Sequence, residues 1–515
     1  MPIASSLKAP AAALLTLWLS GCGSLTMEMP PELARVPSQT PAQWHAPQPH
    51  KGQLQELSTW WQQWRDPLMV ELIDAAQKVS PSVSAARSQI EQARSTLVSA
   101  GAALRPEVSA GASIARSVTR PAIPPSTSQQ GNLSLGNPLQ PYWELDLFGG
   151  NAATRDAAKE RLHGTQAQWH DARVAVAAEV ASQYLGWRSC DMQALVLGQD
   201  MRSRNASSQL TRTLAKAGFQ TPANDALAQA SAAQGRSNLA NQRAQCDGAV
   251  KALVSLTAWG ESALRSRLAN VAATTLVPMQ ADGSIALTSS TLAALQLPSP
   301  PSLAVASVPG EVLAQRPDVF KAERELMAVR FDYGAVDVLR QPQVTFAGNI
   351  GSLNLLSRGA TTGVTTWGVG PLQVTIPIWD WGKHNAALGA AQARYDDAVQ
   401  SYLGTVRNAV KEVEQALVNL QSAGTRGEDA LLAATGYLTS QQAAQALYGA
   451  GLGSLPELEE TRRVTLQAEQ ALLALQLEQA NAWVALYRAA GGGWQRGAQG
   501  PQATVPGQTS AAASP

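Results

Sequence analysis

Two aspartates in matching surroundings are the residues whose types and spacing first suggest chemistry. Asp146 lies in the stretch YWELDLFGGN and Asp380 lies in IPIWDWGKHN, 234 residues apart. In both stretches an acid stands among aromatic side chains and is followed by glycine, asparagine and an alanine-rich run. A carboxylate in apolar surroundings can serve as a general acid or base. The same arrangement also suits a joint between two structural elements, so the elements around each aspartate must decide.

The other side chains that could catalyse a reaction or bind a metal form no recognisable set. The histidines show no metal-ligand spacing, and His163 and His170 share a helix face but lie two turns apart. The sequence contains no GxSxG, no P-loop and no GxGxxG between a strand and a helix. A net charge of +1 gives no basic surface for nucleic acid. We therefore expect a protein that is not an enzyme and that takes no metal, cofactor or nucleic acid.

The N-terminus carries a signal of a different kind. The stretch MPIASSLKAPAAALLTLWLSGC has one lysine, a short apolar run and then the sequence LSGC, which ends at Cys22. The apolar run is too short to span a bilayer, so residues 1–21 are predicted to be a signal peptide. The ending resembles a bacterial lipobox, which implies that Cys22 carries lipid; the alternative is an ordinary signal with an incidental cysteine. No aspartate follows Cys22 to retain a lipoprotein in the inner membrane, so the resemblance implies the outer membrane.

After this signal, the sequence contains an internal repeat of one long unit. Pro81 and Pro317 begin similar stretches, and the order of features after them is preserved down to glycine-containing turns at Gly218 and Gly451. Each unit is predicted to contain a short helix, two strands, a long helix, a turn and a returning helix. An ordered series of matches of this length is not expected by chance.

The predicted strands show apolar residues alternating with weakly polar ones, as in Val108, Ala110, Ala112 and Ile114. They are expected at about 107–117, 132–147, 343–352 and 367–379. No other stretch has the roughly 18 consecutive apolar residues of a membrane helix, so the chain would have to cross a membrane as strands closed into a barrel. Small barrels need about eight strands. Four strands per chain therefore imply an oligomer, and three copies would supply twelve.

The predicted helices are long and free of proline. Val399, Leu403, Val406, Val410 and Val413 follow the 4-3-4-3 spacing of a coiled-coil seam. We therefore expect a mainly α fold with transmembrane β-strands and an internally duplicated unit. Its predicted segments are a signal peptide at 1–21, a lipid-anchored Pro-rich segment at 22–59, a first repeat at 60–259 with a helical hairpin at 152–257, an irregular connection at 260–310, a second repeat at 311–494 with a hairpin at 386–489, and a disordered tail at 495–515.

The two remaining cysteines lie symmetrically about the first predicted turn. The midpoint of Cys190 and Cys246 is residue 218, so antiparallel helices that meet at Gly218 would bring them level. Outside the cytosol such a pair forms either a disulfide or two buried thiols. The sequence leaves both possibilities open.

These features together resemble the outer membrane efflux proteins, the TolC-like and OprM-like exit ducts, and within them the NodT-like lipoprotein branch. The resemblance covers about 60–494 and rests on motifs in a fixed order: the lipobox, YWELDLFG, GEVLAQRPDVFKAE, IPIWDWGKHNAA, YGAGLGSLPELEETRR and AAGGGW. It implies a homotrimer with one twelve-stranded outer-membrane β-barrel and a periplasmic α-barrel. It also implies a periplasmic adaptor and an inner-membrane pump as partners, with drugs or other small molecules passing outward. The alternatives are a type I secretion duct and, from another class, a structural coiled-coil lipoprotein of the cell envelope.

The resemblance also implies roles for residues near the turns. Glu457 and Glu460, together with Asp225, are the candidate gate acids, because like charges around a narrow axis repel one another and favour cations. The alternative is that these acids only stabilise the starts of helices. The candidate adaptor-docking turns contain Gly218, Gly451 and Gly453, which are predicted to take left-handed conformations that end the long helices.

Set among these elements, the two opening aspartates are predicted to lie at a joint between strand and helix. Alternation places Trp143 on one strand face and Asp146 on the other, with Phe148 at the strand end. Glycines then bend the chain, and Asn151 is expected to cap the following helix. The second joint contains Trp379, Asp380 and Trp381.

Overall fold

The computed structural model describes residue 44 and residues 60–119, 130–136, 138–274, 297–298, 309–357, 360–494 and 496. The predicted signal peptide, Cys22, the segment to residue 59, nearly all of the tail and most of the connection after residue 274 lie outside these residues. The chain divides into two compact units. The first comprises Gln89–Thr165 and Lys321–Leu403, and the second Gln166–Phe320 and Gly404–Pro515 with Pro37–Ser88. Each unit contains residues from both sequence repeats.

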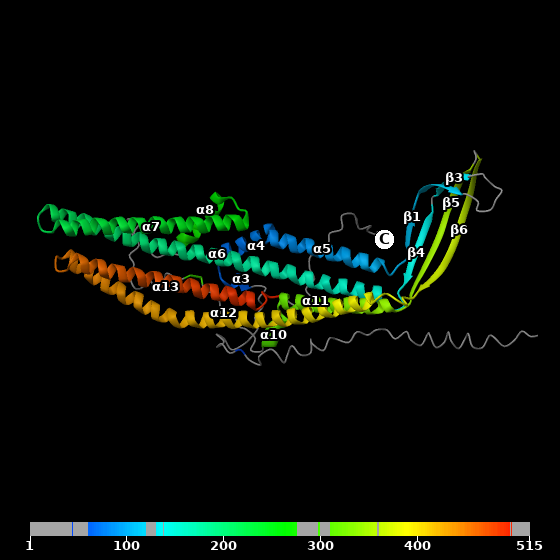
Figure 1. The fold of residues 1–515 in the computed structure, drawn as a ribbon. Coiled ribbons are helices and arrows are strands. Elements are labelled where there is room, and N and C mark those ends of the chain that lie inside the picture. Colours follow the sequence, from blue (N-terminus) through cyan, green and yellow to red (C-terminus); the bar gives the residue numbers. More distant parts are fainter. Residues whose placement is uncertain are drawn as a thin grey trace, which may run out of the picture. The chain divides into compact units, whose positions relative to one another are not determined.

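The first unit contains one antiparallel sheet with the order β1-β4-β5-β3-β2, in which β6 pairs with β5 (Figure 1). The strands are β1 (Glu107–Ala110), β2 (Ser113–Thr119), β3 (Gln130–Gly136), β4 (Leu139–Leu145), β5 (Gln343–Ser357) and β6 (Ala360–Thr375). β1 and β2 are two segments of one interrupted strand, and so are β3 and β4, because the pairing of β1 with β4 and the pairing of β2 with β3 share one continuous register. We call each such interrupted strand one strand run. The sheet therefore has four strand runs, and β5 and β6 form its longest pair.

Several strand boundaries differ from the predicted ones. Two of these differences lie at prolines, where the backbone lacks an N–H group for the next hydrogen bond of the sheet. The first two predicted strands are interrupted near Gly111 and Pro138, where the Gly111 N–H donates to the Pro138 oxygen at 2.9 Å and Pro138 has no N–H of its own. β6 ends at Thr375 rather than at residue 379, and Pro377 stands just beyond it. β5 and β6 extend further toward their shared turn than the expected 343–352 and 367–379. The added residues of β6 are rich in threonine, whereas those of β5, 353–357, include none.

Four helices contribute residues to the first unit. They are α5 (Pro81–Ala102), α11 (Pro317–Asp337), and the beginnings of α6 (Gly150–Lys216) and α12 (Lys383–Gly449). Ion pairs join α6 to α11: Arg161 contacts Asp332 at 2.5 Å and Glu325 at 3.3 Å, and Arg324 contacts Glu160 at 2.9 Å. The side chains of these groups are partly exposed, so the pairs fix orientation more than they add stability.

The second unit contains two helical hairpins, each formed by a long helix and a returning one (Figure 1). α6 is followed by α7 (Pro222–Thr257), and α12 is followed by α13 (Leu455–Ala489). The expected coiled-coil seam is present in α12, where Val406, Val413 and Leu417 are buried. Val413 and Leu417 pack with Tyr184 and Leu185 of α6 and Leu486 of α13 in the largest apolar core of the unit.

Short helices complete this core. They are α3 (Trp60–Gln63), α4 (Pro67–Val79), α8 (Glu261–Thr274) and α10 (Pro309–Ala314). Trp60 of α3 stacks on Tyr487 with ring centroids 4.8 Å apart, and Trp61 and Trp64 surround it. These large rings are buried in the core together with Leu68, Met69 and Leu72 of α4.

The irregular connection expected at 260–310 is wrong in its first part, because residues 261–274 form helix α8. Leu264, Leu268 and Val271 recur at helical spacing, and both leucines are buried in the core. The proline- and serine-rich composition of the later part of the connection concealed this amphipathic pattern. Among the described residues, no helix is both long enough and apolar enough to cross a membrane.

Candidate functional site between the two helical hairpins

Each hairpin turn has a glycine at a position where the backbone conformation would be strained for any other residue. Gly218 and Gly451 have φ values of +79° and +76°. Past them the N–H of Phe219 donates to the Leu214 oxygen at 2.8 Å, and the N–H of Leu452 donates to the Leu447 oxygen at 2.9 Å. These bonds satisfy carbonyls that a helix end leaves without partners. The turns expose one large apolar side chain each, since Phe219 is 78% exposed and Leu452 is 79% exposed.

Gly453 was expected to share this left-handed conformation, and that expectation is wrong. The positive φ values in the turn belong to Gly451 and not to Gly453. A Cβ at Gly453 would lie 3.1 Å from the backbone nitrogen of Tyr448. The residue is therefore small because the chain folds closely back on the end of α12.

The returning helices begin with matching caps. Thr221 accepts a hydrogen bond from the Asn224 N–H at 3.2 Å, and Ser454 accepts one from the Glu457 N–H at 3.3 Å. A proline follows within the first turn of each helix, where its missing N–H costs nothing.

The three predicted gate acids lie in different environments. Glu457 is exposed in the first turn of α13. Glu460 is exposed and binds Arg463 through both carboxylate oxygens at 3.0 and 2.5 Å, and this hydrogen bonding lowers its pKa. Asp225 is partly buried near the start of α7, with one oxygen 3.9 Å from Arg212. Within the described part of the chain, none of the three takes part in the contacts that join the two hairpins.

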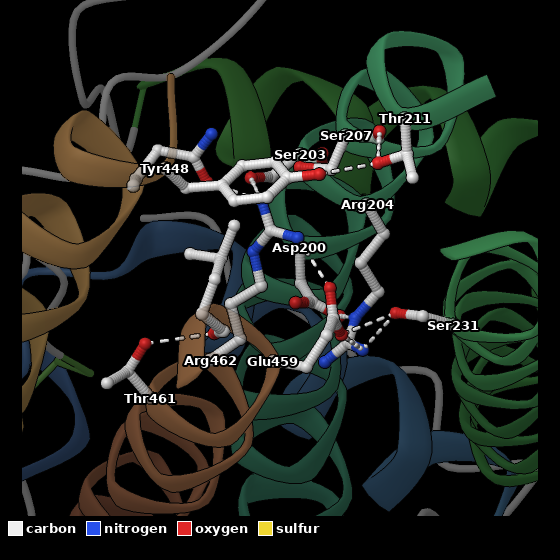
Figure 2. Close-up of polar contacts among 12 residues, drawn as sticks. Asp200, Ser203, Arg204, Ser207, Thr211, Ser231, Tyr448, Glu459, Thr461 and Arg462 are labelled. Atoms are coloured by element: carbon white, nitrogen blue, oxygen red, sulfur yellow. Dashed lines mark hydrogen bonds and ion pairs between the residues drawn. The ribbon is translucent and has the colours of Figure 1, made fainter. Parts of the chain in front are cut away.

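The acid that joins the hairpins is Glu459, which the sequence interpretation passed over (Figure 2). Its Oε2 accepts hydrogen bonds from Arg204 Nη1 of α6 at 2.7 Å and from Ser231 Oγ of α7 at 2.5 Å. Its Oε1 accepts from Arg462 Nη1 of α13 at 2.7 Å. One carboxylate on the second hairpin thereby holds both helices of the first.

Arg462 supplies the next connection. Its side chain is fully buried, and burial lowers its pKa. Its Nη2 donates to Ser203 Oγ at 2.8 Å and to Ser207 Oγ at 2.7 Å, both on α6, and also to the side-chain oxygen of Gln445 on α12. Because these acceptors come from two helices, the guanidinium fixes the distance between them.

A pair of hydroxyls continues the polar contacts toward the turns. Tyr448 Oη of α12 lies 2.6 Å from Thr211 Oγ1 of α6, and both side chains are buried. The Thr211 hydroxyl also donates its one hydrogen to the backbone oxygen of Ser207 at 2.8 Å. The Tyr448 hydroxyl is therefore the donor in the Tyr448–Thr211 pair. We call the whole set the interhairpin cluster; its members are Asp200, Ser203, Arg204, Ser207, Thr211, Ser231, Gln445, Tyr448, Glu459 and Arg462.

The sequence does contain a signal for this cluster. Asp200, Arg204, Ser207 and Thr211 stand three or four residues apart, which places polar side chains on one face of a helix that is otherwise packed. Glu459 stands three residues before Arg462, and the structure pairs them at 2.7 Å. Polar groups that are buried to this extent need hydrogen-bond partners, and these residues supply them to one another.

The two opening aspartates cap helices. Asp146 accepts from the N–H groups of Asn151 at 3.2 Å and Ala152 at 2.7 Å. Asp380 accepts from the N–H groups of Gly382 at 2.9 Å and His384 at 2.8 Å. The carboxylates therefore accept hydrogen bonds from N–H groups at the starts of α6 and α12, and the expectation that Asn151 is the cap is wrong, because Asn151 lies inside α6.

The aromatic residues of the joints lie around these caps. Trp143 donates its indole N–H to the Leu104 oxygen at 3.3 Å, and Phe148 is partly exposed. Trp379 and Trp381 are largely exposed and meet edge to face with centroids 5.5 Å apart. Trp381 takes a left-handed φ of +55° at the bend that leads into α12.

The structure joins Cys190 of α6 to Cys246 of α7 by a disulfide, with Cα atoms 5.5 Å apart. It closes the hairpin that ends at Gly218. Among the described residues, no group of three or more His, Cys, Asp or Glu side chains is arranged to hold a metal ion.

Comparisons with known proteins give these features a context. The family model for outer membrane efflux proteins matches residues 72–258 and 308–492. The pyoverdine export outer membrane protein OpmQ of Pseudomonas putida is 27% identical, over 93% of this chain and 96% of its own. The toluene efflux pump outer membrane protein TtgI of the same species is 26% identical, over 93% and 97%. The solved outer-membrane channel OprN has a TM-score of 0.74 at 23% identity and covers 89% of this chain and 98% of its own. The resemblance, the fold class, the outer-membrane location and the efflux role are thereby confirmed, and the chain belongs to the outer membrane efflux protein family.

Proposed function

We propose that three copies of this chain form the exit duct of a tripartite efflux pump. The sheets of the three copies join into one outer-membrane barrel, and the helical hairpins form the periplasmic end of the passage. A periplasmic adaptor and an inner-membrane pump are the partners. The duct passes drugs or other small molecules and carries out no chemical reaction on them.

The open sheet is the observation that carries this proposal. Within the described residues, β6 pairs only with β5, while β1 and β2 at the other edge pair only with β4 and β3. β6 is 16 residues long, and its outer edge offers a row of backbone donors and acceptors. Such an edge is costly unless another strand covers it, above all where no water is available. Further copies of the same chain supply matching edges.

The interhairpin cluster is proposed to act as a latch. Glu459 and Arg462 hold α13 to α6 and α7. Tyr448 joins α12 to Thr211 of α6, and Gln445 joins α12 to Arg462 of α13. Any movement of one hairpin past the other must break these hydrogen bonds together. The latch therefore favours one setting of the passage until an input from a partner offsets its loss.

Residues outside the latch are proposed to take three further roles. Glu457, Glu460 and Asp225 place negative charge beside the passage and favour cations over anions. The turns at Gly218, Gly451 and Gly453 dock on the adaptor, and the exposed side chains of Phe219 and Leu452 provide an apolar contact. Cys22 is proposed to carry the lipid that anchors the mature N-terminus in the outer membrane.

A deletion strain tests the efflux role. Loss of the gene is expected to raise cellular retention of at least one small molecule in a broad panel, and the wild-type gene restores export. A Phe219→Asp, Leu452→Asp double variant is expected to form trimers with normal heat-modifiable mobility and yet fail to restore export. Unchanged retention across the whole panel, combined with lost secretion of a protein substrate, would instead favour the type I secretion duct.

A further inference from the structure

Beside the interhairpin cluster lies a buried carboxyl that the cluster does not use. Glu469 of α13 is 5% exposed and lines a cavity of about 60 Å³. The polar side chains that share this cavity are Gln199, Asp200, Ser203, Gln441, Arg462 and Thr465. Three helices, α6, α12 and α13, thus enclose one glutamate in a space that is polar and large enough for water.

No cation or donor among the described residues pairs with this carboxyl. Asp200, the other acid that lines the cavity, is committed to Arg204 at 2.7 Å. The terminal nitrogens of Arg462 are committed to Glu459, Ser203, Ser207 and Gln445. The Nε of Arg462 is buried without an acceptor among these residues. An unpaired acid and an incompletely paired guanidinium therefore face the same small cavity.

The charges around Glu469 come from two helices. α6 contributes Asp200 and Arg204, and α13 contributes Arg462 and Glu459. α12 contributes Leu438 and Gln441 to the cavity and has no Asp, Glu, Lys, Arg or His between Asp429 and Tyr448. Burial, together with the nearby charge of Asp200, raises the pKa of Glu469 to about 7. The proton on this carboxyl is therefore exchanged near neutral pH.

We propose that Glu469 is a proton-binding site that sets the strength of the latch. When the carboxyl is protonated, it is neutral in its cavity and Arg462 stays with Glu459 and the serines of α6. When the proton leaves, an uncompensated negative charge remains in the cavity. That charge attracts Arg462, which stands two helical turns earlier on the same helix, and draws it away from its acceptors on α6 and α12.

The sign of the pH dependence follows from the same group. Its ordinary pKa is 4.5 and its folded pKa is about 7, so the latched form binds more protons than a form in which Glu469 meets water. The latched form therefore loses relative stability as pH rises between these two values, and the full penalty is present above about pH 7. This inference rests on the proposed latch, since a proton at Glu469 has no channel to control without it.

Planar-bilayer recordings of the full-length trimer across this pH range test the proposal. Open probability in the wild type is expected to rise with pH, by at most about tenfold per pH unit for each carboxyl that must ionise. Glu469→Gln, which stays neutral, is expected to hold the low-pH behaviour at every pH. The matched control is Glu478→Gln, which removes an exposed carboxyl on the same helix that pairs with Arg426.

The outcomes separate this inference from the latch itself. Glu459→Gln tests the latch and is expected to raise open probability at all pH values. If it does so while Glu469→Gln still follows the wild-type pH curve, the proton site is refuted and the latch stands. If Glu469→Gln fails to form trimers, infrared spectroscopy of the wild type decides: a protonated carboxyl that titrates near pH 7 supports the site, and its absence refutes it.

Discussion

At the scale of single residues, the acids of this chain show what a sequence pattern can and cannot determine. The repeated surroundings of Asp146 and Asp380 predicted a joint between a strand and a helix. Both carboxylates accept hydrogen bonds from backbone N–H groups at the start of a helix. The choice of Asp146 rather than Asn151 as the cap depends on a left-handed bend at Gly149, with φ +77°. A pattern of residue types does not specify that bend.

The gate acids illustrate the same limit. Glu457, Glu459 and Glu460 stand within one turn of α13, and each residue turns the side chain by about 100° around the axis. A shift of one position therefore separates Glu460, which is exposed, from Glu459, which is held between the hairpins. The motif located the correct turn of helix, and only the helix phase in the fold identified the member that binds the other hairpin.

The two neighbouring glutamates give a matched prediction. Glu459→Gln leaves Arg204 and Arg462 without their shared anion and is expected to destabilise the hairpin contact by on the order of 3 kcal/mol. Trimers of this variant should melt at lower temperature and open more often in bilayers. Glu460→Gln removes an exposed carboxylate and should leave the melting temperature unchanged while reducing cation preference. Equal melting temperatures for both variants would contradict the assignment of Glu459 to the latch.

At the scale of elements, the regular parts were predictable and the irregular ones were not. Proline-free runs and the seam around Val413 predicted the long helices, because helix length and burial follow from local pattern. The broken strands near Gly111 and Pro138 depend on pairing between distant residues. Helix α8 was missed because its short amphipathic pattern precedes a proline-rich stretch that dominates the composition.

At the scale of elements, we predict that the disulfide between Cys190 and Cys246 stabilises the α6–α7 hairpin. It closes a loop with a sequence separation of 56 across the α6–α7 hairpin, and loops of this size typically gain about 2–4 kcal/mol. Reduction of the wild type is expected to lower the melting temperature of the trimer. A Cys190→Ser, Cys246→Ser variant should melt at the reduced value and no longer respond to reductant. A wild-type melting temperature that ignores reductant would show that the hairpin packing alone determines stability.

At the scale of the whole molecule, the duplicated sequence predicted the order of elements but not the compact units. Each unit takes residues from both repeats because α6 and α12 continue from the first unit into the second. The sheet, whose two edges have no partner strand within the described residues, belongs to the first unit, and the interhairpin cluster belongs to the second. The edges account for the proposed trimer, and the cluster accounts for its proposed control.

The most direct test of the proposed duct is the ionic conductance of purified full-length trimers in a planar lipid bilayer. Heat-modifiable trimers are expected to give discrete conductance steps, and Glu459→Gln trimers are expected to open more widely or more often under the same conditions. Correctly assembled trimers of both proteins that insert into the bilayer and conduct no ions would contradict the proposed duct.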